Sequence, residues 1–126
     1  MKKIIKTDKA PAPIGPYNQA ILSGNTLYTS GQIAINPETN EMVLDSIENE
    51  TNQVMQNLKA ILNEADMTFN NVVKTSIFLN DMHNFSVVNS VYAKYIDEET
   101  APARETVAVS ALPKFVNVEI SMIAVK

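Results

Sequence analysis

The sequence SIENETNQVMQNLKAILNEA at residues 46–65 is followed closely by VVKTSIFL at residues 72–79. In the first segment, apolar side chains such as Val54, Leu58 and Ile61 recur every three or four residues, which predicts an amphipathic helix. The second segment is rich in β-branched and aromatic residues, which predicts a strand. The change of period between the two segments indicates that helices and strands share one fold.

The first helix is predicted to begin near Ser46, because Asp45 and Glu48 have the spacing of a capping box. A second run of apolar residues with helical spacing predicts another helix at residues 84–96. Turn residues predict two hairpins, one around Ser23-Gly24-Asn25 and one around Leu112-Pro113-Lys114. The remaining strands are predicted at Ile4–Ile5 and at residues 17–22, 27–30, 106–109 and 116–125.

This order of elements predicts an α+β fold, in which a mixed sheet carries both helices on one face. At 126 residues the chain is expected to form a single domain over residues 1–126. The last strand has apolar residues on both faces, since Ile123 and Val125 lie opposite the face of Val118. Because the helices cover only one face, we expect the other to be buried in a closed oligomer. The alternative is a solvated face with two stray aliphatic residues.

Composition excludes several classes of function. Ten basic and fourteen acidic residues give a net charge of −4, which argues against a nucleic-acid partner. There is no cysteine, so disulfides, thiolate metal sites and thiol nucleophiles are excluded. One histidine and three dispersed glycines support neither a site of paired imidazoles nor a phosphate-binding glycine loop.

No segment predicts a membrane span or an export signal. The basic start at Met1–Lys6 is followed by Thr7-Asp8-Lys9, where a signal peptide would continue with apolar residues. The uncharged residues 10–37 are interrupted by prolines and asparagines, unlike a bilayer helix. We therefore expect a cytoplasmic protein.

Arg104 and Glu119 are the strongest candidates for chemistry. The planar guanidinium of Arg104 follows Pro102-Ala103 in an apolar strand, and it matches a carboxylate in a two-bond arrangement. Glu119 stands between Val118 and Ile120, where burial would raise its pKa and suit a general base. A hairpin about Pro113 would equally allow the two residues to form a structural ion pair. Spacing alone leaves both interpretations open.

Three further positions have a functional and a structural interpretation. Tyr17 follows Ile14-Gly15-Pro16 and could close over a ligand, although a boundary tyrosine is the commoner explanation. Gly31, after Ser30, permits a ligand to approach the backbone closely, although a β-bulge explains a glycine at this position as well. His83 lies among polar residues at a helix start, and we assign it no catalytic role.

Several ordered motifs together closely resemble the RidA/YjgF family over nearly the whole chain. They are Ala12-Pro13-Ile14-Gly15-Pro16-Tyr17, Thr29-Ser30-Gly31-Gln32-Ile33, Pro102-Ala103-Arg104, Leu112-Pro113 and Val118-Glu119-Ile120. The resemblance implies a chorismate-mutase-like homotrimer whose clefts between subunits bind small carboxylate ligands. It also implies a cofactor-independent, metal-free hydrolase. Such an enzyme converts the 2-imino acids released by pyridoxal-phosphate-dependent dehydratases, 2-iminobutanoate and 2-iminopropanoate, to 2-keto acids and ammonium.

The resemblance also assigns roles to individual residues. It implies that Arg104 binds the substrate carboxylate and that Glu119 activates water. Tyr17, Ser30, Gly31, Asn89 and Thr106 are implied to line the substrate site. Thr106 stands where many members have a cysteine, and Ala101 replaces an aromatic residue that is common before the Pro-Ala-Arg motif, which affects the width of the cleft.

Two other functions occur among relatives. The first is a regulatory trimer that senses a small molecule and modulates a transcriptional or metabolic regulator. The second is RNA cleavage, against which the acidic composition and the lack of a basic patch beside aromatic residues argue.

Overall fold

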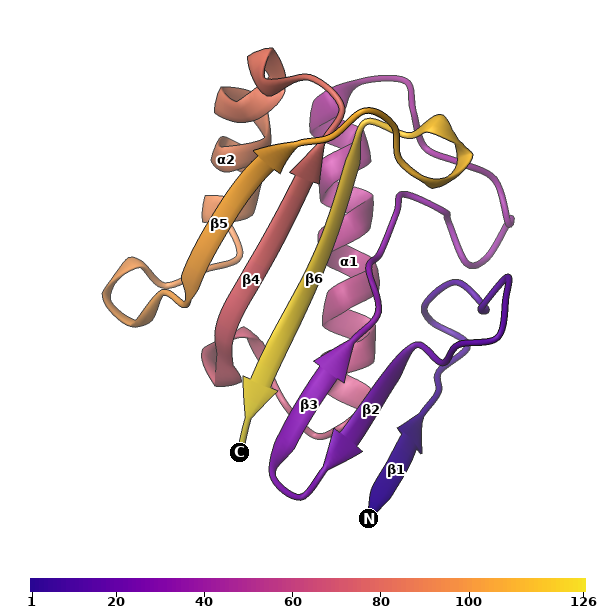
Figure 1. The fold of residues 1–126 in the computed structure, drawn as a ribbon, viewed down its shortest axis with the longest axis vertical. Coiled ribbons are helices and arrows are strands. Elements are labelled where there is room, and N and C mark those ends of the chain that lie inside the picture. The colour runs from indigo at the N-terminus through magenta and orange to yellow at the C-terminus, as the bar shows by residue number, and fades with distance from the viewer.

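Six strands form one mixed sheet in the order β1-β2-β3-β6-β4-β5, and the computed structural model describes all residues 1–126. Two helices pack on one face of this sheet and leave the opposite face uncovered (Figure 1), as the order of elements predicts. The strands are β1 (Lys2–Ile5), β2 (Ala20–Ser23), β3 (Thr26–Thr29), β4 (Val72–Leu79), β5 (Ala103–Ala108) and β6 (Val118–Val125), and the helices are α1 (Ile47–Glu64) and α2 (Phe85–Ala93).

Helix α1 begins where the sequence predicts, but its cap differs from the prediction. The hydroxyl oxygen of Ser46 accepts a hydrogen bond from the backbone N–H of Asn49 at 3.0 Å, so Ser46 is the N-cap. Asp45 instead accepts a bond from the side chain of Asn49, and it forms no capping box with Glu48. Serine at this position satisfies a backbone donor of the first turn, which is why the helix starts here.

The first hairpin is confirmed and the second is wrong. Strands β2 and β3 pair antiparallel on either side of Gly24, whose φ is +58°. Strands β5 and β6, in contrast, are separated by β4, which pairs with β5 in parallel and with β6 antiparallel. Helix α2 crosses over between β4 and β5, and such a crossover returns the next strand parallel to the first. The long apolar β6 then takes the central position between β3 and β4.

Several predicted boundaries also shift. The structure has β1 from Lys2, β5 over Ala103–Ala108 and β6 from Val118, where the sequence predicts strands from Ile4, over 106–109 and from residue 116. Strand β2 begins at Ala20, because Tyr17 belongs to the preceding loop, where its backbone N–H bonds to the carbonyl of Gly15. Helix α2 ends at Ala93, short of the predicted Ile96. Tyr95 and Ile96 still pack against the core, from the turn that follows the helix.

The core lies between the sheet and the helices. It contains 21 buried residues, and those of α1 and β6 alternate with exposed positions as expected from their periods. The uncovered face of the sheet carries Ile4, Tyr28, Val107 and Val125, all of them at least one third exposed. No helix has both the length and the hydropathy of a membrane span.

Candidate functional site

Arg104 lies on the edge strand β5, on the face of the sheet that the helices cover. Its register partner on β4 is the buried Thr75. The guanidinium carbon lies 5.7 Å from the ring centre of Phe85 and 5.2 Å from that of Tyr92, both on α2. Nη1 donates a hydrogen bond to Oδ1 of Asn89 at 2.8 Å. Helix α2 therefore holds the guanidinium by two aromatic faces and one hydrogen bond.

Tyr92 is itself fixed from behind. Its hydroxyl donates to Oγ1 of the fully buried Thr75 at 2.9 Å. Burial raises the pKa of the Tyr92 hydroxyl, so that group stays neutral. The ring under Arg104 is thus anchored to β4, the strand next to β5. The other N–H groups of the guanidinium have no partner in the chain and are free to bind an anion.

Glu119 lies on the opposite, uncovered face of the sheet. Its neighbours in β6, Val118 and Ile120, are fully buried against the helices, so alternation points Glu119 the other way. The carboxylate makes no hydrogen bond or ion pair within the chain. Burial raises the pKa of Glu119 above its ordinary value, as the sequence predicts for a carboxyl group between apolar residues.

Gly31 lies directly against Glu119. A Cβ built on Gly31 would lie 2.7 Å from Cδ of Glu119, so the glycine leaves the space that the carboxylate occupies. The next residue, Gln32, exchanges two backbone hydrogen bonds with Ile120, at 2.8 and 3.1 Å. A cavity of about 60 Å³ lies here, and its lining includes Ile14, Tyr17, Gly31, Pro113 and Glu119.

Tyr17 and Ser30 belong to the same region. The hydroxyl oxygen of Tyr17 accepts a hydrogen bond from the backbone N–H of Ile14 at 3.3 Å. Because that bond uses the oxygen as acceptor, the O–H proton of Tyr17 remains free to donate. Ser30 donates from Oγ to the carbonyl of Asn18 at 2.5 Å, so its side chain holds the loop that carries Tyr17.

The structure therefore divides the predicted residues into two groups. The first, the arginine group, contains Arg104 of β5 and Asn89 of α2, on the face of the sheet that the helices cover. The second, the glutamate group, contains Glu119, Gly31, Tyr17 and Ser30 on the uncovered face. Strand β4 separates β5 from β6, so Arg104 and Glu119 do not form the ion pair that sequence analysis left open. One chain does not bring both groups to a common small ligand.

Thr106 belongs beside the arginine group. It is two residues after Arg104 in β5 and pairs with the buried Ile77, so its side chain faces the helices. Its Oγ1 is buried and has no hydrogen-bond partner. An unpaired buried hydroxyl lowers the stability of the folded state, so such a group is unusual at a position with a purely structural role.

His83 is far more exposed than any of these residues. Its side chain is 97% exposed, and its ring Nδ1 lies 2.8 Å from Oδ1 of Asp81, which also accepts from the His83 backbone. The bond from the His83 backbone caps a short 3-10 turn ahead of α2, so His83 lies at an exposed helix start, as the sequence predicts. No cluster of three or more His, Cys, Asp or Glu side chains is arranged to hold a metal ion.

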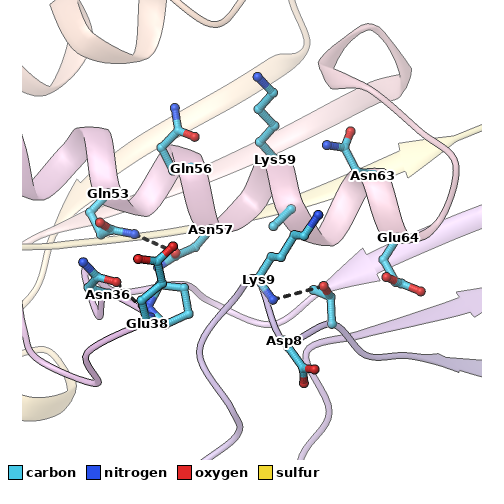
Figure 2. A pocket seen from close by; sticks show the side chains of 13 residues that line it. Asp8, Lys9, Asn36, Glu38, Gln53, Gln56, Asn57, Lys59, Asn63 and Glu64 are labelled. Carbon is cyan, nitrogen blue, oxygen red and sulfur yellow. Dashed lines mark hydrogen bonds between the residues drawn. The ribbon is translucent and has the colours of Figure 1, made fainter.

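A larger hollow lies elsewhere. It has a volume of about 690 Å³ and lies along α1, between the loops at Thr7–Lys9 and Asn36–Glu38. Its lining is almost wholly polar, and Lys9 lies extended across it (Figure 2). None of the predicted site residues lines it. Ligand sites are usually more apolar, with a few convergent polar groups, so size does not make this hollow the site.

Sequence analysis did not connect Phe85 and Tyr92 with Arg104, although both rings contact its guanidinium. Their helical spacing was assigned to the core-facing side of α2, where Phe85 and Tyr92 do pack. The available signal was Asn89, four residues after Phe85 and three before Tyr92, which places all three on one face of the helix. An asparagine between two aromatic residues at that spacing indicates a face that also meets a polar group.

The chain matches known proteins over nearly its whole length. A profile described as endoribonuclease L-PSP matches residues 7–126. The RutC family protein slr0709 of Synechocystis is 52% identical over 124 residues, covering 98% of this chain and 95% of the relative. The Rid-family protein YyfA of Yersinia pestis, a solved structure, is 48% identical with a TM-score of 0.97 over the full length of both chains. Escherichia coli TdcF, solved with bound serine, is 38% identical with a TM-score of 0.93 over 98% of both chains.

Proposed function

The chain belongs to the endoribonuclease L-PSP family, which includes the RidA/YjgF proteins, and from this we propose that it hydrolyses 2-imino acids to 2-keto acids and ammonium. The substrates of this proposed deaminase are 2-iminobutanoate and 2-iminopropanoate, the unstable products of dehydratases that act on hydroxy amino acids. The reaction needs no cofactor, because the carbon of a protonated imine is already electrophilic.

The observation that carries the proposal is the fixed guanidinium of Arg104. Asn89 takes one of its N–H groups, and the rings of Phe85 and Tyr92 hold its plane. A planar, always charged fork with free N–H groups binds a carboxylate with a defined direction. In the proposed reaction Arg104 holds the substrate carboxylate and so fixes the adjacent C=N carbon.

Glu119 supplies the base. Its carboxylate has no partner in the chain, and burial raises its pKa toward the range where a general base works well. It takes a proton from water as the water oxygen bonds to the imine carbon. The protonated Glu119 then gives this proton to the nitrogen of the tetrahedral adduct, which restores the carboxylate. The C–N bond breaks as the adduct's C–O bond becomes a carbonyl, and the hydroxyl proton passes to the departing ammonia, which leaves the 2-keto acid and ammonium. Tyr17 lines the same cavity as Glu119, and its O–H is suited to bind the departing nitrogen or the new oxygen.

The two groups would meet between subunits of a homotrimer. In such an assembly the uncovered sheet face of one protomer packs against a neighbour, and the glutamate group of one protomer lies near the arginine group of the next. The exposed apolar residues of that face, such as Tyr28 and Val107, fit this arrangement. The serine bound to TdcF supports a ligand with an α-carboxylate. Thr106 would supply a polar group beside the bound acid.

A coupled assay tests the proposal. A threonine dehydratase generates 2-iminobutanoate, and 2-ketobutyrate is followed with and without this protein. We expect faster formation of the keto acid with the wild-type chain, and a loss of that effect in Arg104→Ala. If the wild-type protein binds the ligand without accelerating hydrolysis, the regulatory alternative replaces the deaminase.

A further inference from the structure

Glu50 is a fully buried carboxyl group without a cationic partner. It lies in the first turn of α1 and has an exposed fraction of 0%. Neither of the ion pairs in the chain includes it. A carboxyl group costs more to bury than an apolar one, so its partners explain why it is there.

Those partners are the residues that lead into Glu119. Oε2 of Glu50 accepts from the backbone N–H of Asn117 at 2.8 Å and from that of Val118 at 3.1 Å. Oε1 accepts from the side-chain amide of Asn117 at 2.7 Å. The two carboxyl oxygens thus hold the chain at the start of β6, and the next residue is Glu119.

Asn117 extends this contact to the neighbouring strand. Its Oδ1 accepts from Nδ2 of Asn80 at 2.9 Å, and its carbonyl accepts from the backbone N–H of Asn80 at 3.2 Å. Asn80 directly follows β4. The first turn of α1, the end of β4 and the start of β6 are therefore joined in one polar network around Glu50.

We propose that Glu50 is a positioning residue, which fixes the start of β6 and thereby aims the carboxylate of Glu119; this rests on the function proposed above. Glu119 is held from both sides, by the bond from the Val118 N–H to Glu50 and by the paired bonds between Ile120 and Gln32. Its carboxylate has little room beside Gly31. A small shift of β6 therefore turns the carboxylate away from its place.

Two variants of Glu50 and one control test this role. Glu50→Leu removes all three bonds at similar volume, whereas in Glu50→Gln one oxygen still accepts from the backbone N–H groups. Thr51→Val is the control, because Thr51 is equally buried in the same helical turn and its hydroxyl bonds only to the carbonyl of Ile47. We expect kcat about tenfold or more lower in Glu50→Leu, a smaller loss in Glu50→Gln, and KM nearly unchanged in both. Thr51→Val should leave kcat unchanged.

A second readout does not depend on activity. The titration of the Glu119 carboxyl is followed by carbon NMR in the folded proteins, and its midpoint should move toward 4.5 in the Glu50 variants but not in Thr51→Val. If Glu50→Leu does not fold, Glu50→Gln alone decides by this titration. An unmoved Glu119 titration in a folded Glu50 variant would overturn the positioning role. Absence of turnover by the wild-type protein would instead overturn the proposed function, and the titration would still decide the role of Glu50.

Discussion

The carboxylate of Glu119 fills the space that a side chain on Gly31 would need: a Cβ built on Gly31 would lie 2.7 Å from Cδ and 2.8 Å from Oε1 of Glu119. Both residues lie on the uncovered face of the sheet, joined by the bridge between Gln32 and Ile120. The absence of a side chain at Gly31 is therefore what allows the carboxylate its position. The φ of Gly31 is not in the left-handed region, so space and not backbone conformation requires the glycine.

Gly31→Ala should lower activity far more than stability. The atoms that an added methyl group meets belong to a flexible side chain, which moves aside at little cost. The displaced carboxylate no longer aims water correctly, so we expect kcat to fall about 10- to 100-fold. Steady-state kinetics in the dehydratase-coupled assay and a thermal melt check both parts.

Gly24→Ala is the matched control. Gly24 has open space around it, but its φ of +58° is strained for any residue with a Cβ. This variant should lose about 1 kcal/mol of unfolding free energy and keep its kcat. Equal loss of kcat in the two variants would show that Gly31 acts on the fold and not on Glu119.

Tyr92→Phe and Tyr92→Leu should separate the hydroxyl of Tyr92 from its ring. The phenylalanine variant leaves Oγ1 of the buried Thr75 without its partner, which should cost about 1–2 kcal/mol of unfolding free energy. It keeps a ring beside Arg104, so KM should change little. The leucine variant removes that ring and should raise KM about threefold or more, as expected for the loss of a cation–π contact. Denaturant unfolding and kinetics measure the two effects; a KM as high in Tyr92→Phe as in Tyr92→Leu would contradict the role of the ring.

The sequence predicts the elements well and their arrangement only in part. The period of residues 46–65 and the turn at Gly24 are local signals, and both elements form as predicted. The place of β6 depends on competition between distant segments for the centre of the sheet, and no local pattern encodes it. The separation of Arg104 from Glu119 onto opposite faces could not be predicted either, because it depends on the register in which both strands pair with β4, with Arg104 beside Thr75 and Glu119 beside Phe78.

The pH dependence of kcat should reflect Glu119. Burial raises the pKa of this carboxyl above 4.5, and only the ionised form accepts a proton from water. In the wild type, kcat should therefore rise with pH through a midpoint above pH 4.5. Glu119→Gln should lose most of its turnover, and its kcat should no longer rise over this range. The pH profile of kcat in both proteins measures this rise. If kcat of Glu119→Gln still rises with pH, the titrating group is not Glu119.

The same group affects stability in a defined direction. Because the pKa of Glu119 is higher in the folded than in the unfolded state, the protonated carboxyl group favours folding. This contribution to the unfolding free energy is fully present below pH 4.5 and is lost as pH rises through the pKa of the folded protein. Glu119→Gln removes the ionisation. Its unfolding free energy relative to the wild type should therefore increase as pH rises through that range, as measured by denaturant unfolding at several pH values.

A mixture of two inactive variants should regain activity if Arg104 and Glu119 act together across a subunit boundary. Arg104→Ala keeps the glutamate group intact, and Glu119→Gln keeps the arginine group intact. When equal amounts are unfolded together and reassembled at random, each site draws its arginine group from one protomer and its glutamate group from the next. Each group is intact with probability one half, so about a quarter of the sites should be complete. Residues acting within one protomer would give no recovery.

The same experiment tests which face forms the boundary. Val107 on the uncovered sheet face and Val87 on α2 are each 40% exposed, so they form a matched pair. Adding Val107→Lys to both variants places a charge in the proposed interface and should abolish the recovery, with a smaller particle in light scattering. Adding Val87→Lys should leave about the same quarter of wild-type activity. Recovery that survives Val107→Lys and disappears with Val87→Lys would place the boundary on the helices, and the two groups of residues would then have to meet in another way.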